Sequence, residues 1–259
     1  MLLLIMTNSA TLYEEYKKTM QRIADIKYSS AVLQWDQETY LPPKSSYFRN
    51  RQITTLNELA HDAFINRRTG DLLSELSKRD DLSISHKRNI DLTVIDYNRA
   101  LKLSTEFVGK LSNAISRAYH SWMDARKANS FTIFESSLNE LVELKQQEAE
   151  MLGYINHPYN ALLNDYDKGL TVTTLDNLFS SLQPKLVSIL NKIQSLPPVD
   201  DSFLKQHFPK DVQWAFGLNI LKDLNFDFNH GRQDLSEHPF TTNFSSKDVR
   251  ITTRIDEND

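Results

Sequence analysis

TIFESSLNELV, at residues 132–142, carries the pattern that decides the fold. Its apolar residues recur at the three- and four-residue spacing of one helix face: Phe134, Leu138, Leu141 and Val142. Thr132 and Glu135 fit a capping box that opens this helix. The segment lies in a long run, from Lys44 to His157, that contains no proline, and only three glycines interrupt it: Gly70, Gly109 and Gly153. A proline-free run of this length predicts several long helices.

Helical patterns also lie on both sides of this run. A first helix is expected at about Thr11–Ile26, where one apolar stripe contains Leu12, Tyr16, Met20 and Ile23. Thr173 and Asp176 fit a second capping box, which precedes an apolar pattern that reaches Ile193. Pro184 lies inside that pattern and predicts a kink or a break.

The pattern changes toward the C-terminus. Pro197–Asp201 is expected to be a linker or loop, and residues 211–224 a short helix. Val249, Ile251 and Thr253 then alternate with polar residues, which is typical of a half-buried strand. The predicted fold class is therefore mainly α, with a small β element near the C-terminus.

The predicted strand carries the sharpest chemical pattern, Asp248-x-Arg250-x-Thr252. Alternate residues share one face of a strand and are about 6–7 Å apart. The Arg250 guanidinium offers a rigid fork for a carboxylate, and a neighbouring Asp248 can fix the orientation of that fork. The alternative is a surface strand with a cross-strand ion pair, which contributes little to stability. Spacing alone leaves both interpretations open.

His238-Pro239-Phe240 precedes this strand. The residue before a proline is held extended, so His238 could present its imidazole to a cleft. An ordinary turn is the alternative interpretation.

Two earlier segments are also candidates for substrate contact. Leu33–Pro43 contains Trp35 and Asp36 at a helix end before a double proline, and packing of a partly buried Trp35 is the simpler interpretation. His157–Thr171 contains Tyr159 and Asp165. It could line a substrate site, or simply connect two helices with Gly169 as the C-cap.

Bulk composition narrows the class of protein. The chain has a formal net charge of −4, so it lacks the excess of basic residues that is typical of nucleic-acid-binding proteins. The chain has no cysteine, which excludes disulfides, thiolate zinc sites and a cysteine nucleophile, and fits a cytoplasmic protein. The apolar stretch Met1–Met6 is too short for a signal peptide or a membrane span. Residues 1–8 are expected to be disordered or variable.

Four common catalytic or cofactor-binding motifs are absent from the sequence. None of the 7 histidines is four residues from another, so there is no His-Glu-x-x-His zinc helix. No phosphate loop, nucleophile elbow or dinucleotide glycine motif occurs either. We therefore expect no catalytic residue and no metal ligand within this chain.

Four ordered segments together resemble the carboxypeptidase Taq family of thermostable zinc metallocarboxypeptidases. Leu33–Pro42 is similar to the family's Leu-x-Trp-Asp-Gln-x-Thr-x-Met-Pro run, with Leu41 in place of Met. His157–Thr171 is similar to its His-Pro-Tyr-Asp segment, with Asn160 where Asp is usual. His238–Phe240 and Asp248–Thr252 match its His-Pro-Phe and Asp-x-Arg-x-Thr signatures. The resemblance runs from about residue 9 to 259 and corresponds to the N-terminal half of a family member.

The resemblance implies a mostly helical enzyme, often a homodimer, that removes C-terminal amino acids from peptides with broad preference. It implies Zn²⁺ held by a His-Glu-x-x-His helix and a downstream Glu, all beyond the position of Asp259. The chain would then supply substrate-binding residues: Arg250 for the terminal carboxylate, Asp248 to orient it, His238 at the scissile region, and Thr252 beside them.

Three functional hypotheses follow. In the first, the chain is the N-terminal portion of a metallocarboxypeptidase catalytic domain, inactive alone. In the second, it is a non-catalytic helical module that binds peptides or a partner. In the third, a second polypeptide supplies the missing half and completes the site.

Overall fold

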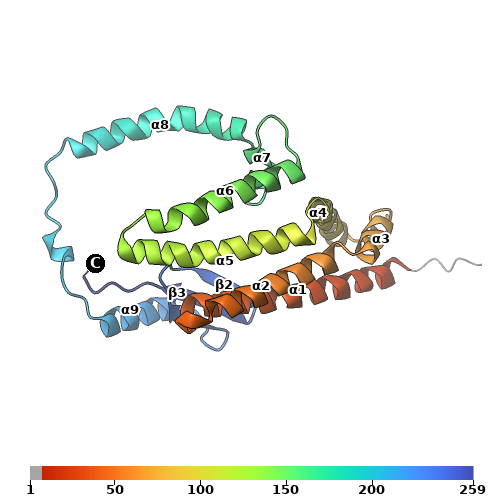
Figure 1. The fold of residues 1–259 in the computed structure, drawn as a ribbon, viewed down its shortest axis with the longest axis horizontal. Helices are drawn as coiled ribbons and strands as arrows, with labels where there is room; N and C mark the ends of the chain where they lie inside the picture. Colours follow the sequence, from red (N-terminus) through yellow and green to blue (C-terminus); the bar gives the residue numbers. More distant parts are fainter. Residues whose placement is uncertain (1–7, 259) are drawn as a thin grey trace, which may run out of the picture. The chain divides into compact units, whose positions relative to one another are not determined.

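The computed structural model describes residues 8–258 and is mainly helical, with nine α-helices and one three-stranded sheet in that range (Figure 1). The expectation for residues 1–8 falls on residues outside this range except for Asn8, which caps the first helix. The chain divides into two compact units, the first ending at Leu152 and the second beginning at Gly153. No helix within residues 8–258 is long and apolar enough to cross a membrane.

Between residues 8 and 152, the first unit contains helices and no strand. Its elements are α1 (Ser9–Thr39), η1 (Pro43–Ser45), α2 (Ser46–Phe64), α3 (Arg67–Leu76), α4 (Ile84–Ala100), α5 (Thr105–Ala128) and α6 (Thr132–Leu152). Helix α1 packs against α2, α2 against α5, and α5 against α6. Serine and asparagine side chains cap several of these helices, as Ser104 caps α5 by accepting from the Phe107 N–H at 3.1 Å.

Helix α1 is longer than the predicted Thr11–Ile26. Asn8 accepts a hydrogen bond from the Ala10 N–H at 2.9 Å, and the helix then continues to Thr39. Neither glycine nor proline occurs between Ile26 and Pro42, so nothing in the sequence ends the helix earlier. The added length places Trp35 and Asp36 in the last turns of α1.

Two clusters form the core of the first unit. The larger joins α1, α3 and α4 through Leu12, Tyr13, Tyr16, Leu72, Leu73, Leu76 and Ile90. The smaller joins α5 and α6 through Phe107, Ala114 and Leu144. The predicted helix at residue 132 is confirmed as α6, but the capping box is wrong. Thr132 lies inside the first turn, and the Glu135 N–H donates to the Phe131 carbonyl oxygen at 3.1 Å.

The second unit contains helices and the sheet. Its elements are α7 (Tyr159–Leu163), α8 (Val172–Gln194), η2 (Ser202–Leu204), α9 (Lys210–Asp223), β1 (Gly231–Leu235), β2 (Thr241–Ser245) and β3 (Asp248–Thr253). The short helix predicted at 211–224 is confirmed as α9, and residues 197–201 form the predicted loop.

The predicted start of α8 was two residues late. Thr171, not Thr173, is the N-cap, and its hydroxyl accepts from the Thr174 N–H at 3.2 Å. The helix runs through Pro184 to Gln194, so the proline does not break it. Gly169 lies in the turn between α7 and α8 with a positive φ of 89°, where a side chain would be strained. It is not the C-cap of α7, which is Asn164.

The predicted C-terminal strand is confirmed as β3, the central strand of the sheet. The strand order of the sheet is β1-β3-β2, with β1 parallel and β2 antiparallel to β3. Gly231 permits the close pairing at the start of β1, since a Cβ there would lie 2.4 Å from the Val249 carbonyl oxygen. The register places Arg232 and Thr242 on either side of Arg250.

Candidate functional site

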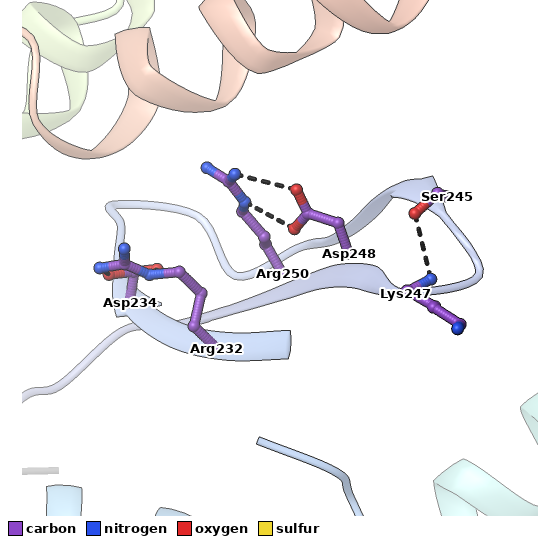
Figure 2. Close-up of polar contacts among 6 residues, drawn as sticks. All are labelled: Arg232, Asp234, Ser245, Lys247, Asp248 and Arg250. Atoms are coloured by element: carbon purple, nitrogen blue, oxygen red, sulfur yellow. Dashed lines mark hydrogen bonds and ion pairs between the residues drawn. The ribbon is translucent and has the colours of Figure 1, made fainter. Parts of the chain in front are cut away.

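Asp248 and Arg250 form a bidentate ion pair on β3 (Figure 2). Arg250 Nε donates to Asp248 Oδ1 at 3.0 Å, and Arg250 Nη2 donates to Asp248 Oδ2 at 3.1 Å. The two side chains meet because residues two apart on a strand share a face. This confirms that an acid and a guanidinium lie on one face, and the pair lies within β3 rather than across strands.

A third side chain fixes the plane of the Arg250 guanidinium. Its Cζ lies 4.9 Å from the ring centroid of Phe244, which is buried on β2. A cation over an aromatic face is attracted to the ring, more strongly where water is excluded. The Arg250 side chain is only 18% exposed, so Asp248 and Phe244 together hold a partly desolvated guanidinium in one orientation.

A second ion pair lies beside the first. Arg232 Nε donates to Asp234 Oδ2 at 2.7 Å, and Arg232 Nη2 donates to Asp234 Oδ1 at 2.6 Å. The parallel register pairs Arg232 with Arg250, and Figure 2 shows both side chains on the same face of the sheet. The order of charges is reversed between the strands, since β1 reads Arg-x-Asp and β3 reads Asp-x-Arg. Sequence reasoning missed Arg232 and Asp234, although this mirrored spacing was the signal that could have found them.

The Thr252 side chain hydrogen-bonds the segment that precedes β2 to the central strand. Its hydroxyl is buried, accepts from the Phe240 N–H at 2.9 Å and lies 3.2 Å from the Phe240 carbonyl oxygen. Ser236 Oγ lies 2.7 Å from both Thr252 Oγ1 and the His238 carbonyl oxygen, and it can donate to either. Thr252 therefore fixes the backbone that carries His238-Pro239-Phe240.

His238 itself lies in the bend between β1 and β2, with its residue exposed to solvent. Asp248, Arg250 and Thr252 thus lie on one strand, β3, and the hydrogen bonds of Ser236 join the His238 backbone to Thr252. Whether these four residues contact a substrate stays a prediction.

Trp35 and Asp36 belong to the first unit. Trp35 is buried, and its ring centroid lies 5.7 Å from that of Tyr40. Asp36 Oδ2 accepts from Arg49 Nη1 at 2.5 Å, and the same nitrogen donates to the Leu33 carbonyl oxygen at 3.0 Å. These contacts join the end of α1 to the start of α2, which agrees with the packing interpretation of this segment.

Glu38, two residues beyond Asp36, is a further titratable group in this segment. Burial raises the pKa of the Glu38 carboxyl above its ordinary value, and a hydrogen bond with Tyr119 opposes that rise. Ser116 of α5 contacts Gln37, so the end of α1 packs its polar side chains against α5.

Tyr159 and Asp165 lie at the ends of a short connection. Tyr159 is the first residue of α7 and is half exposed, and its N–H donates to His157 Nδ1 at 3.1 Å. Asp165 follows α7 in the turn that leads to α8, where its N–H donates to the Leu162 carbonyl oxygen at 3.1 Å. The helix-to-helix connection is confirmed, and a substrate role for these two residues stays a prediction.

The side chains of the sheet do not suit a metal ion. Both sheet carboxylates, Asp234 and Asp248, are engaged by guanidinium groups. Across residues 8–258, no group of three or more His, Cys, Asp or Glu side chains is gathered so as to hold a metal. The donors of a zinc site, which need lone pairs directed at one point, are not assembled in this part of the chain.

Known proteins match this chain over most of its length. Carboxypeptidase 1 of Bacillus subtilis (strain 168) is 32% identical over 255 residues, which cover 96% of this chain and 50% of that protein. The solved structure of BsuCP superposes with a TM-score of 0.93 at 31% identity, covering 96% of this chain and 50% of that one. The structure of CHT gives a TM-score of 0.82 at 47% identity, with the same coverage.

The chain spans about half the length of the curated relatives it matches. The family model described as carboxypeptidase Taq (M32) metallopeptidase matches residues 15–259. This chain therefore belongs to the carboxypeptidase Taq (M32) family of metallopeptidases.

Proposed function

We propose that this chain supplies the substrate-carboxylate site of a zinc-dependent carboxypeptidase that releases C-terminal amino acids from peptides. The observation that carries the proposal is the Asp248–Arg250 pair, backed by the Phe244 ring. Asp248 accepts one hydrogen bond from Nε and one from Nη2, and so occupies the Nε–Nη2 edge of the guanidinium. We assign the peptide's terminal carboxylate to the outer Nη1–Nη2 edge, because this edge matches two carboxylate oxygens.

Asp248 and Phe244 have a positioning role in this proposal. An arginine side chain loses rotamer entropy when it binds a ligand, and a guanidinium already held in place loses less. Arg232 lies next to Arg250 in the register and adds a second guanidinium on the same face. Thr252 holds the segment that carries His238, so that the imidazole can contact the peptide near the scissile bond.

The catalytic chemistry that we propose requires a zinc ion, as is usual in this family of metallopeptidases. Zinc, when bound, polarises the scissile carbonyl and lowers the pKa of a water molecule. Since residues 8–258 offer no cluster of metal-binding side chains, we propose that another part of the enzyme supplies the zinc ligands and the general base. The resemblance to the family also underlies two further proposals, that the intact enzyme is a homodimer and that it acts in the cytoplasm.

Incubation of the 259-residue chain with one equivalent of Zn²⁺ and a mixture of short peptides tests this division of labour. We expect mass spectrometry to find the peptides intact, although they bind with their free C-termini. Release of C-terminal residues together with stoichiometric zinc binding would contradict the proposal. Intact peptides that bind equally well as amides would instead favour a peptide-binding module without a carboxylate site.

A further inference from the structure

The apolar face of α8 is exposed to solvent over most of its length. Six side chains form this face, and each residue is at least 40% exposed: Leu178, Phe179, Leu182, Leu186, Ile189 and Ile193. We call these six residues the α8 stripe. In the part of the chain that the structure describes, α8 has no buried residue. The apolar stripe of α1 is covered instead, since Leu12, Tyr16 and Ile23 are at most 7% exposed.

The α8 stripe is continuous along the helix. Successive residues of a helix are rotated by about 100°, so the spacings from Leu178 to Ile193 place all six residues within about 100° of arc. The stripe is about 22 Å long for a rise of about 1.5 Å per residue. Large contiguous apolar surfaces are rare on monomers and mark sites of interaction.

The spacing within the stripe fits a partner helix. Phe179, Leu186 and Ile193 recur every seven residues, and Leu182 and Ile189 follow the first two of them by three residues. This alternation of three and four residues is that of packed helices, in which the side chains of one helix insert between those of another. We therefore expect the stripe to be covered by a helix that has an apolar face of its own.

Pro184 lies on the opposite face of α8. A residue two positions after Leu182 is rotated by about 200°, so the proline does not interrupt the stripe. Pro184 has no N–H to donate to the Ser180 carbonyl oxygen, and the backbone hydrogen bonds are weakened on that face. Helices bend with the weakened side toward solvent and the other side toward the core. The position of Pro184 thus agrees with a stripe that packs against a partner.

One flank of the α8 stripe is basic. Lys185 and Lys192 are seven residues apart and lie on the same side of the stripe, about 60–80° around the helix from Leu182. Both lysines are exposed, and neither takes part in an ion pair within residues 8–258. Charges that flank the apolar positions of packed helices select partners of opposite charge. The partner helix is therefore expected to carry Asp or Glu beside its apolar face.

A second copy of this chain fits the stripe less well. In an antiparallel pair, two-fold symmetry brings the same flanks together, so Lys185 and Lys192 would meet the lysines of the other copy. In a parallel pair they would meet the flank that carries Gln183 and Leu190, which are uncharged. A lipid surface also fits less well, because the polar face of α8 is made mostly of Ser, Thr, Asn and Gln, whereas membrane-surface helices are rich in Lys and Arg.

We propose that the α8 stripe binds a helix from the half of a carboxypeptidase Taq (M32) peptidase that this chain does not match. That helix carries acidic residues opposite Lys185 and Lys192. The chain covers about half of each relative that it matches, so a segment of similar length has no counterpart in it. The inference rests on the proposed function only for the identity of the partner, because we assign the zinc ligands to the same part of the enzyme. The place of docking follows from α8 itself.

Co-expression of the 259-residue chain with the half of Bacillus subtilis carboxypeptidase 1 that it does not match tests the proposal. Size-exclusion chromatography with light scattering should find a complex of one copy of each polypeptide. L182E with I189E should lower its recovery at least about tenfold, because the two carboxylates would be buried at an apolar contact. K185E with K192E should also lower it, and added salt should weaken the parent complex.

N177E with N191E is the matched control. It adds the same two charges to the polar face of α8 and should leave recovery of the complex unchanged. All four substituted residues of the two variants are exposed, so the isolated chains should keep the circular dichroism spectrum of the parent. Equal recovery for the parent and L182E with I189E, or no complex with the parent, overturns the proposal.

Two further measurements identify a different occupant. A dimer of the isolated chain that L182E with I189E dissociates would assign the stripe to a second copy. Binding of the parent, but not of that variant, to vesicles of phosphatidylcholine and phosphatidylserine would assign it to a lipid surface. Either result overturns the proposal. Arg250→Gln separates this inference from the proposed function, since it should abolish the preference for a free C-terminus and leave the complex intact.

Discussion

Arg232 and Arg250 are register partners on the parallel strands β1 and β3, and each guanidinium is held by an aspartate two residues away on its own strand. Two arginines side by side would repel each other without these carboxylates. The pairing therefore lets the sheet concentrate hydrogen-bond donors on one face at little electrostatic cost. It also suggests different roles for the two aspartates, because Asp234 is 2% exposed and the Asp248 side chain is 39% exposed.

Asp248→Asn should weaken peptide binding more than it weakens the fold. The amide keeps the shape of the side chain but cannot hold the guanidinium with two charge-assisted bonds. We expect affinity for a peptide with a free C-terminus to fall about tenfold, measured by fluorescence anisotropy. Asp256→Asn is the control, since Asp256 Oδ2 lies 3.8 Å from Arg254 Nη2 in an ion pair that is more exposed to solvent. An unchanged affinity for the Asp248 variant would contradict the orienting role.

Asp234→Asn should mainly lower stability. Its buried carboxylate accepts two hydrogen bonds from Arg232, and the variant leaves a buried amide in poor geometry. The expected loss is about 1–3 kcal/mol of the free energy of unfolding, measured by urea denaturation. Asp248→Asn should cost less by the same measurement, because its carboxylate is more exposed. The reverse order would contradict the assignment of Asp234 as the structural member.

Thr252→Val should loosen the segment that carries His238. Valine has nearly the shape of threonine but cannot accept the hydrogen bond from the Phe240 N–H. We expect faster amide hydrogen exchange at Phe240 and a loss of about 1–2 kcal/mol in stability. Thr253→Val, one residue along β3 on the opposite face, should leave the exchange rate at Phe240 unchanged. Equal rates in both variants would show that the Thr252 hydroxyl does not hold this segment.

His120 should make the first unit less stable in mild acid. Burial lowers the pKa of its imidazole below the ordinary value of 6.5, and Asp124 partly opposes that shift. The unfolded chain therefore binds the proton at higher pH than the folded one. The contribution of neutral His120 to the free energy of unfolding is complete above about pH 6.5 and is lost as the pH falls through the lowered pKa.

Thermal melting between pH 5 and pH 8 measures this dependence. His120→Gln should flatten the slope below pH 6.5, whereas His207→Gln, at an exposed histidine, should leave it as it is. If both variants keep the slope of the parent chain, another group causes it.

Much of the fold could be predicted from the sequence, because proline and glycine mark where helices end. The long helices around α6, the loop at Pro197 and the strand at Asp248 followed from spacing alone. The residues that cap the helices could not be predicted from spacing alone. Thr171 and Thr173 are equally good capping residues by type, and only the backbone geometry of the turn after Gly169 selects Thr171.

The surroundings of the candidate site were harder to predict. Asp248 and Arg250 are two residues apart, so their contact is local. Arg232 is 18 positions away in the sequence, and only the parallel pairing of β1 with β3 brings it beside Arg250. A five-residue strand such as β1, with charged residues at alternate positions, gives no hydrophobic alternation from which to predict its register.

The account rests on Arg250 as the residue that binds the terminal carboxylate of a peptide. The most direct test compares the affinities of a fluorescent peptide and its C-terminal amide for the parent chain, Arg250→Gln and the control Arg254→Gln. The parent and the control should bind the free acid at least about tenfold more tightly than the amide, and Arg250→Gln should bind both equally. If Arg250→Gln folds like the parent and still prefers the free acid tenfold, the carboxylate is bound elsewhere and the central claim is wrong.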